Sequence, residues 1–341
     1  MNTANASNAT PRDYLANSLI RTQREAITQC AEHMRRAITH RNIVYTGLTA
    51  LRLAMIEIPD CPRLISAWFH VLYTDRGQRP KRTGTRYLKL PESLRSQPNI
   101  TYLHGETVIT CTHPLVTWAV LAPFLTQTEV IVLADAMLRA ACRAVGSNGT
   151  ELTKERLSDF LSNVGDFPGI DKCRAALAFL STPTDSTMEC RTLLAFLRHG
   201  LPYPIVHWQT RITNPEALVT SDLAYPDQLV VVEYDGDAHR QDKRQYRWDE
   251  RKRQALRAQG HTVIVAFADD VLTERGRLAL ARKVAQALGM ELPGKPLPPY
   301  RALMEDDRRA HDRNRQRRCR ARKRGANEAT GANWTSGTTQ A

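Results

Sequence analysis

Acidic residues cluster around a short apolar run in the second half of the chain. The segment 229–232 is continuously apolar and mostly β-branched, which predicts a strand buried on both faces. Glu233 and Asp235 follow it directly, and Asp222 lies on a second apolar piece just before it. Carboxylates that converge from neighbouring strands repel one another unless a cation neutralises them. The spacing therefore predicts a site for a hard divalent ion such as Mg²⁺ or Mn²⁺. A plain hairpin with a solvated acidic tip would have the same spacing.

The segment 181–290 contains the elements that would position these carboxylates. We expect a helix at 187–197, strands at 205–211, 218–225 and 229–234, a helix at 242–259, a strand at 262–267 and a helix at 270–288. The order α-β-β-β-α-β-α predicts an α/β fold, in which a mixed sheet is flanked by helices.

The remainder of the chain divides into three parts by composition. Residues 1–20 are polar and predicted to be disordered, and 21–180 alternate helical and strand patterns, which indicates an α+β domain that binds nucleic acid or a partner. A basic loop at 76–84 within this domain is either a solvated hairpin tip or a wing that contacts phosphates. Residues 291–341 are predicted to form a polybasic disordered tail.

The charge of the chain favours a polyanionic partner. The formal net charge is +13, and the segment 301–324 contributes +7 of it, with eleven Lys and Arg against four Asp and Glu. Such an excess points first to nucleic acid. The seven cysteines include no C-x-x-C pair, which fits reduced thiols in the cytoplasm. No apolar run is long enough to span a bilayer, so no membrane partner is expected.

Several motifs of the second half resemble a known nuclease family. The pattern Asp222-Leu-Ala-Tyr-Pro, Val-Val-Glu233-Tyr-Asp235-Gly-Asp-Ala-His239, Arg247-Trp-Asp and Gly260-His-Thr-Val-Ile is similar to uncharacterised endonuclease-like proteins related to very-short-patch repair endonucleases. These proteins share the PD-(D/E)XK, restriction-endonuclease-like fold. The similarity includes Met-Glu189-Cys-Arg on the preceding helix, where the family has a Met-Glu-Ser-Arg-like motif.

The resemblance implies a catalytic role for each matching residue. Asp222 and Glu233 would hold Mg²⁺ or Mn²⁺, and Glu189 would be a supporting or second-metal carboxylate. The implied activity is an endonuclease that hydrolyses DNA phosphodiester bonds, in repair or phage defence. The wider fold carries a lysine where this chain has Asp235, which leaves the general base unassigned.

Two groups of residues have both a functional and a structural explanation. His239 is either the general base or a histidine that caps the turn. The cations of the following helix would hold the nucleic-acid backbone, or they form a solvated face with Asp249 and Glu250. The residues concerned are Lys243, Arg244, Arg247 and Arg251. We expect Tyr246 and Trp248 to be core or helix-face aromatics.

A second function fits the same fold. The N-terminal portion is similar to regions of type IV abortive-infection antitoxin-like proteins, which implies a toxin or another protein as a partner. The chain would then be a DNA-binding regulator or antitoxin with a non-catalytic nuclease-like scaffold, since a fold does not fix a function.

Overall fold

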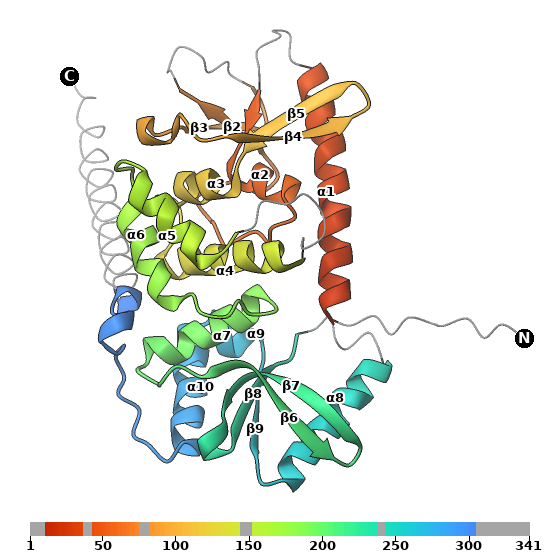
Figure 1. Ribbon diagram of the computed structural model, residues 1–341, viewed down its shortest axis with the longest axis vertical. Helices are drawn as coiled ribbons and strands as arrows, with labels where there is room; N and C mark the ends of the chain where they lie inside the picture. The colour runs from red at the N-terminus through yellow and green to blue at the C-terminus, as the bar shows by residue number, and fades with distance from the viewer. Residues whose placement is uncertain (1–10, 37–42, 75–81, 144–151, 237–242, 305–341) are drawn as a thin grey trace, which may run out of the picture.

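The computed structural model describes residues 11–36, 43–74, 82–143, 152–236 and 243–304. Two mixed β-sheets, each accompanied by helices, form the molecule (Figure 1). The first sheet lies in the N-terminal half and the second in the C-terminal half. The mixed α/β class predicted from the sequence is confirmed.

The first sheet has the strand order β3-β2-β1-β5-β4. Its strands are β1 (Val44–Tyr45), β2 (Phe69–Tyr73), β3 (Thr85–Lys89), β4 (Asn99–His104) and β5 (Thr107–Thr112). Strands β2 and β3 run parallel, with Phe69 opposite Thr85. The predicted hairpin at the basic loop is therefore wrong, because a hairpin joins antiparallel strands and the chain here must cross over. Residues 75–81 of that loop lie outside the described residues.

Helices cover this sheet and fill the middle of the molecule. They are α1 (Pro11–Arg35), α2 (Gly47–Leu53), α3 (Pro114–Leu121), α4 (Gln127–Arg143), α5 (Lys154–Asn163) and α6 (Ile170–Ala176). Helix α1 corrects the prediction of disorder over 1–20, since the stretch from Pro11 onward is helical. Partly buried Leu15 and Leu19 extend the helical spacing of buried Ala26 and Cys30 toward the N-terminus. Residues 1–10 are not described.

The second sheet follows the predicted order. It comprises β6 (Ile205–Thr213), β7 (Glu216–Tyr225), β8 (Val230–Tyr234) and β9 (Thr262–Ala266), with helices α7 (Thr187–Arg198), α8 (Lys243–Ala258), α9 (Ala268–Leu272) and α10 (Glu274–Ala287). Strands β6, β7 and β8 are antiparallel neighbours and β9 is parallel to β8. The single helix predicted at 270–288 is interrupted at Thr273, whose hydroxyl caps α10 by accepting a hydrogen bond from Gly276 N at 2.9 Å.

Alternate residues of the central strands face different helices. Val230 and Val232 pack into the main core, which includes residues of α7 and α10. Val231 packs instead against Ala255 and Leu256 of α8. Because successive side chains of a strand point to opposite faces, this sheet is a layer between helices.

The segment after α10 corrects the predicted start of the tail. Residues 291–304 are described, and they include the short helix η6 (Pro298–Tyr300). Tyr300 packs on Phe179 with ring centroids 5.2 Å apart, and Leu303 is buried. These apolar contacts hold residues 291–304 on the protein. The basic residues that follow them had led to the prediction of disorder. Residues 305–341 lie outside the described part of the chain.

No helix among the described residues is long and apolar enough to cross a membrane.

Candidate functional site

Strand register brings Asp222 and Glu233 together. Strands β7 and β8 pair with Leu223 opposite Val232 and Ala224 opposite Val231. Asp222 and Glu233 are the next residue on each strand, and both line the same pocket. Asp222 Oδ2 accepts a hydrogen bond from Tyr234 N at 2.8 Å, which fixes one of its oxygens at the end of the ladder.

Helix α8 brings two cations to these carboxylates. Lys252 Nζ lies 2.5 Å from Glu233 Oε1 and donates a hydrogen bond to Thr220 O at 2.7 Å. Arg253 contacts Asp235, with NH2 donating to Oδ2 at 2.9 Å, and its Nε lies 3.7 Å from Glu233 Oε2. Lys252 and Arg253 are both buried. Buried cations of this kind are held by their carboxylate partners.

Asp222 is in an unfavourable position for a charged carboxylate. Burial raises its pKa well above the usual range, and the negative charges of Glu189 and Glu233 raise it further. The nearby Lys252 and the hydrogen bond from Tyr234 N act in the opposite direction. Burial and the neighbouring carboxylates therefore disfavour a charged Asp222 more than Lys252 and Tyr234 N favour it.

Glu189 comes to the site from the first turn of α7. Its carboxylate accepts hydrogen bonds from Ser186 Oγ and from Asp185 N, both at 2.9 Å, while Ser186 Oγ accepts from Glu189 N at 3.2 Å. This reciprocal capping arrangement orients the side chain at the helix N-terminus. Its charge reaches Asp222, as the raised pKa of that residue shows.

The N-terminal half fixes the position of α7. Arg191 of α7 makes a bidentate pair with Glu129 of α4, at 3.0 and 2.7 Å. Arg139 of α4 pairs with Glu57 and Asp135, both at 2.6 Å. We call these five residues the interface cluster. It ties α7 to α4, and Figure 1 shows α7 between α4 and the second sheet.

A pocket of about 260 Å³ opens beside these groups. Its lining combines the acidic and basic residues with an aromatic one: Leu218, Val219, Thr220, Asp222, Glu233, Tyr234, Asp235, Trp248, Asp249, Lys252 and Arg253. The carboxylate oxygens are ligands that Mg²⁺ and Mn²⁺ accept. The pocket thus combines oxygen donors for a hard cation with side chains that can bind an anion.

The structure brings together four of the five residues predicted to be catalytic. Glu189, Asp222, Glu233 and Asp235 lie around this site. His239 lies outside the described residues, as do the side chains of Lys243 and Arg244. Arg247 and Arg251 are exposed on α8. Trp248 and Tyr246 are exposed rather than core residues, and Trp248 lines the pocket.

Sequence reasoning did not single out three residues close to the site. In the sequence Lys252 was one of several cations on its helix. Its spacing of three residues from buried Ala255 places it on the buried face of α8, and this spacing is the signal that could have singled it out. Asp185 and His207 had no motif around them. A two-residue turn at Asn214–Pro215 sets the register of β6 and β7 and would have placed His207 near Asp222.

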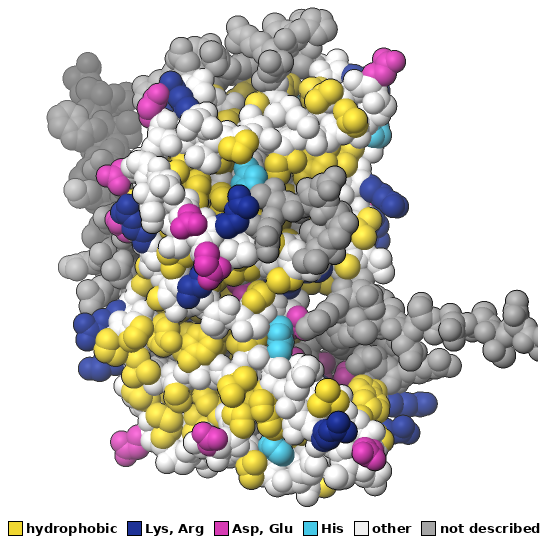
Figure 2. Space-filling model, viewed as in Figure 1, with side chains coloured by type: hydrophobic (Ala, Val, Ile, Leu, Met, Phe, Trp, Pro, Cys, Tyr) yellow, Lys and Arg dark blue, Asp and Glu magenta, His cyan; other side chains and the backbone are white. Residues whose placement is uncertain are grey.

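The described cations do not form one continuous basic band on the face shown in Figure 2. Lys and Arg side chains there are scattered singly or in small groups among polar and apolar residues. Much of the positive charge of the chain lies in the segment 301–324, most of which is not described.

Comparisons with known proteins give similarity without a function. No family model matches the chain, and no solved structure matches it. It is 30% identical over 121 residues to the uncharacterized protein MT2308 of Mycobacterium tuberculosis strain CDC 1551 / Oshkosh, and equally to the uncharacterized protein Rv2248 of strain ATCC 25618 / H37Rv. The match covers 35% of this chain and 44% of each relative. The chain therefore spans less than half the length of these relatives.

Proposed function

We propose that residues 181–290 form a restriction-endonuclease-like domain and that the protein is a metal-dependent endonuclease acting on DNA. One observation carries the proposal. The register of β7 and β8 brings Asp222 and Glu233 together, beside a pocket that also contains Lys252. An acidic pair with a lysine within reach is the arrangement that phosphodiester hydrolysis requires.

Lys252 supports the proposal because it supplies a lysine that the motif at Asp235 lacks. The wider family places its lysine two residues after the glutamate, where this chain has an aspartate. In the folded protein a lysine from α8 reaches the same glutamate, with Nζ 2.5 Å from Glu233 Oε1. We assign to Lys252 the positioning of the attacking water and the stabilisation of charge on the phosphate. Asp235, paired with Arg253, would keep that arginine beside the pocket.

The donor set fits a hard divalent ion. Asp222 and Glu233 offer oxygen ligands, and a bound cation would offset the burial and the neighbouring carboxylates that raise the pKa of Asp222. When bound, Mg²⁺ or Mn²⁺ would polarise the phosphate and lower the pKa of a coordinated water. Arg247 and Arg251, exposed on α8, would contact the DNA backbone next to the pocket.

One observation favours the alternative of a non-catalytic scaffold in a DNA-binding regulator or antitoxin-like protein. Glu233 and Asp235 are paired with Lys252 and Arg253 as the structure stands. Such pairs can hold α8 on the sheet without any ion. The regulator would use the same basic residues to bind DNA, with a toxin or another protein as a partner of the N-terminal half.

Plasmid cleavage separates the two functions. Purified full-length protein is incubated with supercoiled and linear DNA in Mg²⁺, Mn²⁺ or EDTA, beside Asp222→Ala and Glu233→Ala. Exposed Asp227, in the turn between the same two strands, supplies the matched control Asp227→Ala. The proposal expects cleavage that needs metal, disappears in the first two variants and persists in the control. DNA binding without cleavage, unchanged in all three variants, would favour the regulator.

A further inference from the structure

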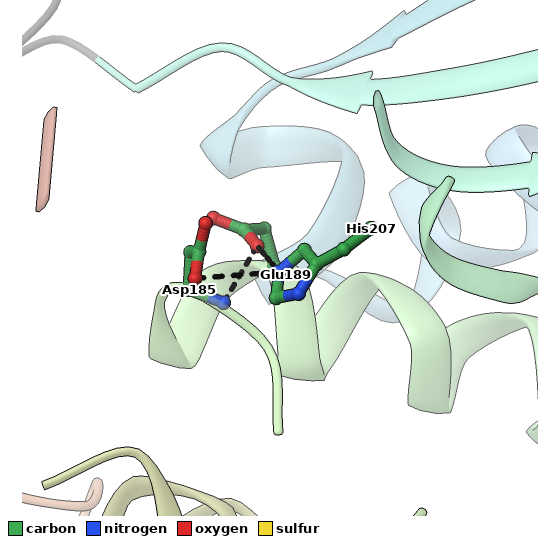
Figure 3. Close-up of side chains that lie close together, drawn as sticks. All are labelled: Asp185, Glu189 and His207. Carbon is green, nitrogen blue, oxygen red and sulfur yellow. Dashed lines mark hydrogen bonds and ion pairs between the residues drawn. The ribbon is translucent and has the colours of Figure 1, made fainter. Parts of the chain in front are cut away.

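A second group of metal-ligating side chains lies on the α7 side of the sheet. Asp185 precedes α7, Glu189 is in its first turn, and His207 reaches them from β6 (Figure 3). His207 Nε2 is 3.3 Å from Asp185 Oδ1 and 3.8 Å from Glu189 Oε2. One ligand atom from each residue lies within 4.8 Å of the other two. Two oxygens and one nitrogen therefore already converge on one point.

His207 has an unusual backbone conformation for a residue within a strand. Its φ is +54°, in the left-handed region that only a few per cent of residues other than glycine occupy, histidine more often than most. The β6–β7 ladder has partners on either side, Val206 with Leu223 and Trp208 with Ser221, and is interrupted at His207 itself. Unusual backbone conformations of this kind are concentrated at functional sites.

The imidazole nitrogen that faces the carboxylates is buried without a hydrogen bond. Among the described residues, Nε2 of His207 has no hydrogen-bond partner, although two carboxylate oxygens lie within 4 Å. Buried polar atoms in folded proteins are nearly always satisfied by a protein group, a water or an ion. An ion between the nitrogen and the two oxygens would give Nε2 of His207 a partner.

We propose that Asp185, Glu189 and His207 bind a divalent transition-metal ion, with Zn²⁺ as the representative ion and Mn²⁺ as its paramagnetic probe. The imidazole ligand decides this class, because Mg²⁺ prefers oxygen ligands and retained waters, whereas neutral imidazole suits first-row transition ions. None of the three ligands is Asp222 or Glu233. The proposal therefore goes beyond the proposed hydrolysis, and Glu189 would connect the two centres.

The test measures binding and the identity of a ligand, and needs no DNA. Full-length protein is titrated with Mn²⁺ by calorimetry, with Mg²⁺ in parallel, and bound Mn²⁺ is examined by pulsed electron paramagnetic resonance for ¹⁴N coupling. The variants are His207→Asn, chosen because asparagine tolerates positive φ, and Asp185→Asn. His261→Asn is the matched control, since His261 is a partly buried histidine of the same half that contacts Trp208. Glu233→Gln disables the proposed nuclease centre alone.

The expected result is a Mn²⁺ site with ¹⁴N coupling in the wild type, in His261→Asn and in Glu233→Gln, in addition to any Mn²⁺ that Asp222 and Glu233 bind. His207→Asn should lose the coupling, and both ligand variants should weaken Mn²⁺ binding at least about tenfold while Mg²⁺ binding changes little. Circular dichroism shows whether each variant is folded. Wild-type Mn²⁺ without ¹⁴N coupling, or coupling that survives in folded His207→Asn, would overturn the proposal. Loss of binding in Glu233→Gln alone would place the ion at the nuclease centre instead.

Discussion

Two groups of buried charges lie on opposite sides of α7, and they are balanced differently. In the interface cluster, Arg139 pairs with Glu57 and Asp135, and Arg191 makes a bidentate pair with Glu129. Around the second sheet, five carboxylates lie near only Lys252, Arg253 and His207. Several of these groups border an open pocket. We call this second group the pocket cluster. Its members are Asp185, Glu189, His207, Asp222, Glu233, Asp235, Lys252 and Arg253.

The difference distinguishes a structural use of charge from a functional one. Ion pairs in which each carboxylate contacts a guanidinium fix one helix against another. An excess of carboxylates beside a pocket raises the free energy of the folded protein unless a cation binds there. The interface cluster should therefore control stability, and the pocket cluster should control ligand binding and chemistry.

Breaking the interface cluster should have the largest effect on stability. Arg139→Met leaves Glu57 and Asp135 buried without their cation, and we expect a loss of about 3–5 kcal/mol in the free energy of unfolding, measured by urea denaturation. Arg156→Met, on an exposed position of α5, is the control and should change stability by less than about 0.5 kcal/mol. A loss below about 1 kcal/mol in Arg139→Met would mean that the cluster is not what holds α7.

Removing the lysine of the pocket cluster should affect chemistry more than folding. Lys252→Met should slow DNA cleavage about a hundredfold, the order of effect of losing one group that stabilises developing charge. The neighbouring exposed Arg251→Met is the control and should cleave within a few fold of the wild type at low salt. Equal rates in the two variants would remove Lys252 from the catalytic machinery.

His33, a half-buried histidine of the N-terminal half, should make the stability of the protein depend on pH. Burial, and then the charge of Arg82, lower the pKa of His33 to about 4. Its ring nitrogens lie 2.9 Å from Tyr45 Oη and 3.1 Å from Thr85 Oγ1. The unfolded chain takes up a proton near pH 6.5 and the folded protein does not until about pH 4. Stability should therefore fall as pH falls through this interval, by about 1–2 kcal/mol after allowance for solvent.

Chemical denaturation at pH 7 and pH 4.5 measures this loss. His33→Gln has no titrating group, so it should lose about 1–2 kcal/mol less than the wild type between the two pH values. The same acid-induced loss in both proteins would show that His33 is not its source.

The smallest effect is expected when an exposed cation of α8 is replaced, and it should appear in DNA binding. Arg251→Gln should weaken DNA binding modestly and reduce the dependence of log K on log salt by about 0.9, the contribution of one phosphate contact. Fluorescence anisotropy at several salt concentrations measures the slope. An unchanged slope would place the DNA on another surface.

Much of the second half of the molecule could be predicted from the sequence. The apolar run 229–232 and the turn residues around it defined β8, and the carboxylates at its end were found because they interrupt that run. The pairing of Asp222 with Glu233 needed only the assumption that two neighbouring strands are antiparallel. Local composition is enough to predict a site when one strand and its turn determine the geometry of that site.

Other features depend on contacts between distant segments, which local composition does not contain. Lys252 reaches Glu233 only because α8 packs on the sheet through Ala255 and Leu256. His207 joins Asp185 through an unusual backbone conformation that no residue pattern indicates. The tail was predicted to start too early because its basic end outweighed the packing of Tyr300 and Leu303.

Asp222→Asn tests the central claim most directly, because it removes one ionisable carboxyl group from the pocket cluster and keeps the shape of the side chain. The measurement is the single-turnover rate of plasmid cleavage in Mn²⁺, at matched concentrations of folded protein. The account predicts a rate at least about a hundredfold below that of the wild type, in a protein as stable as the wild type or more stable because repulsion is relieved. A folded Asp222→Asn protein that cleaves as fast as the wild type would contradict it.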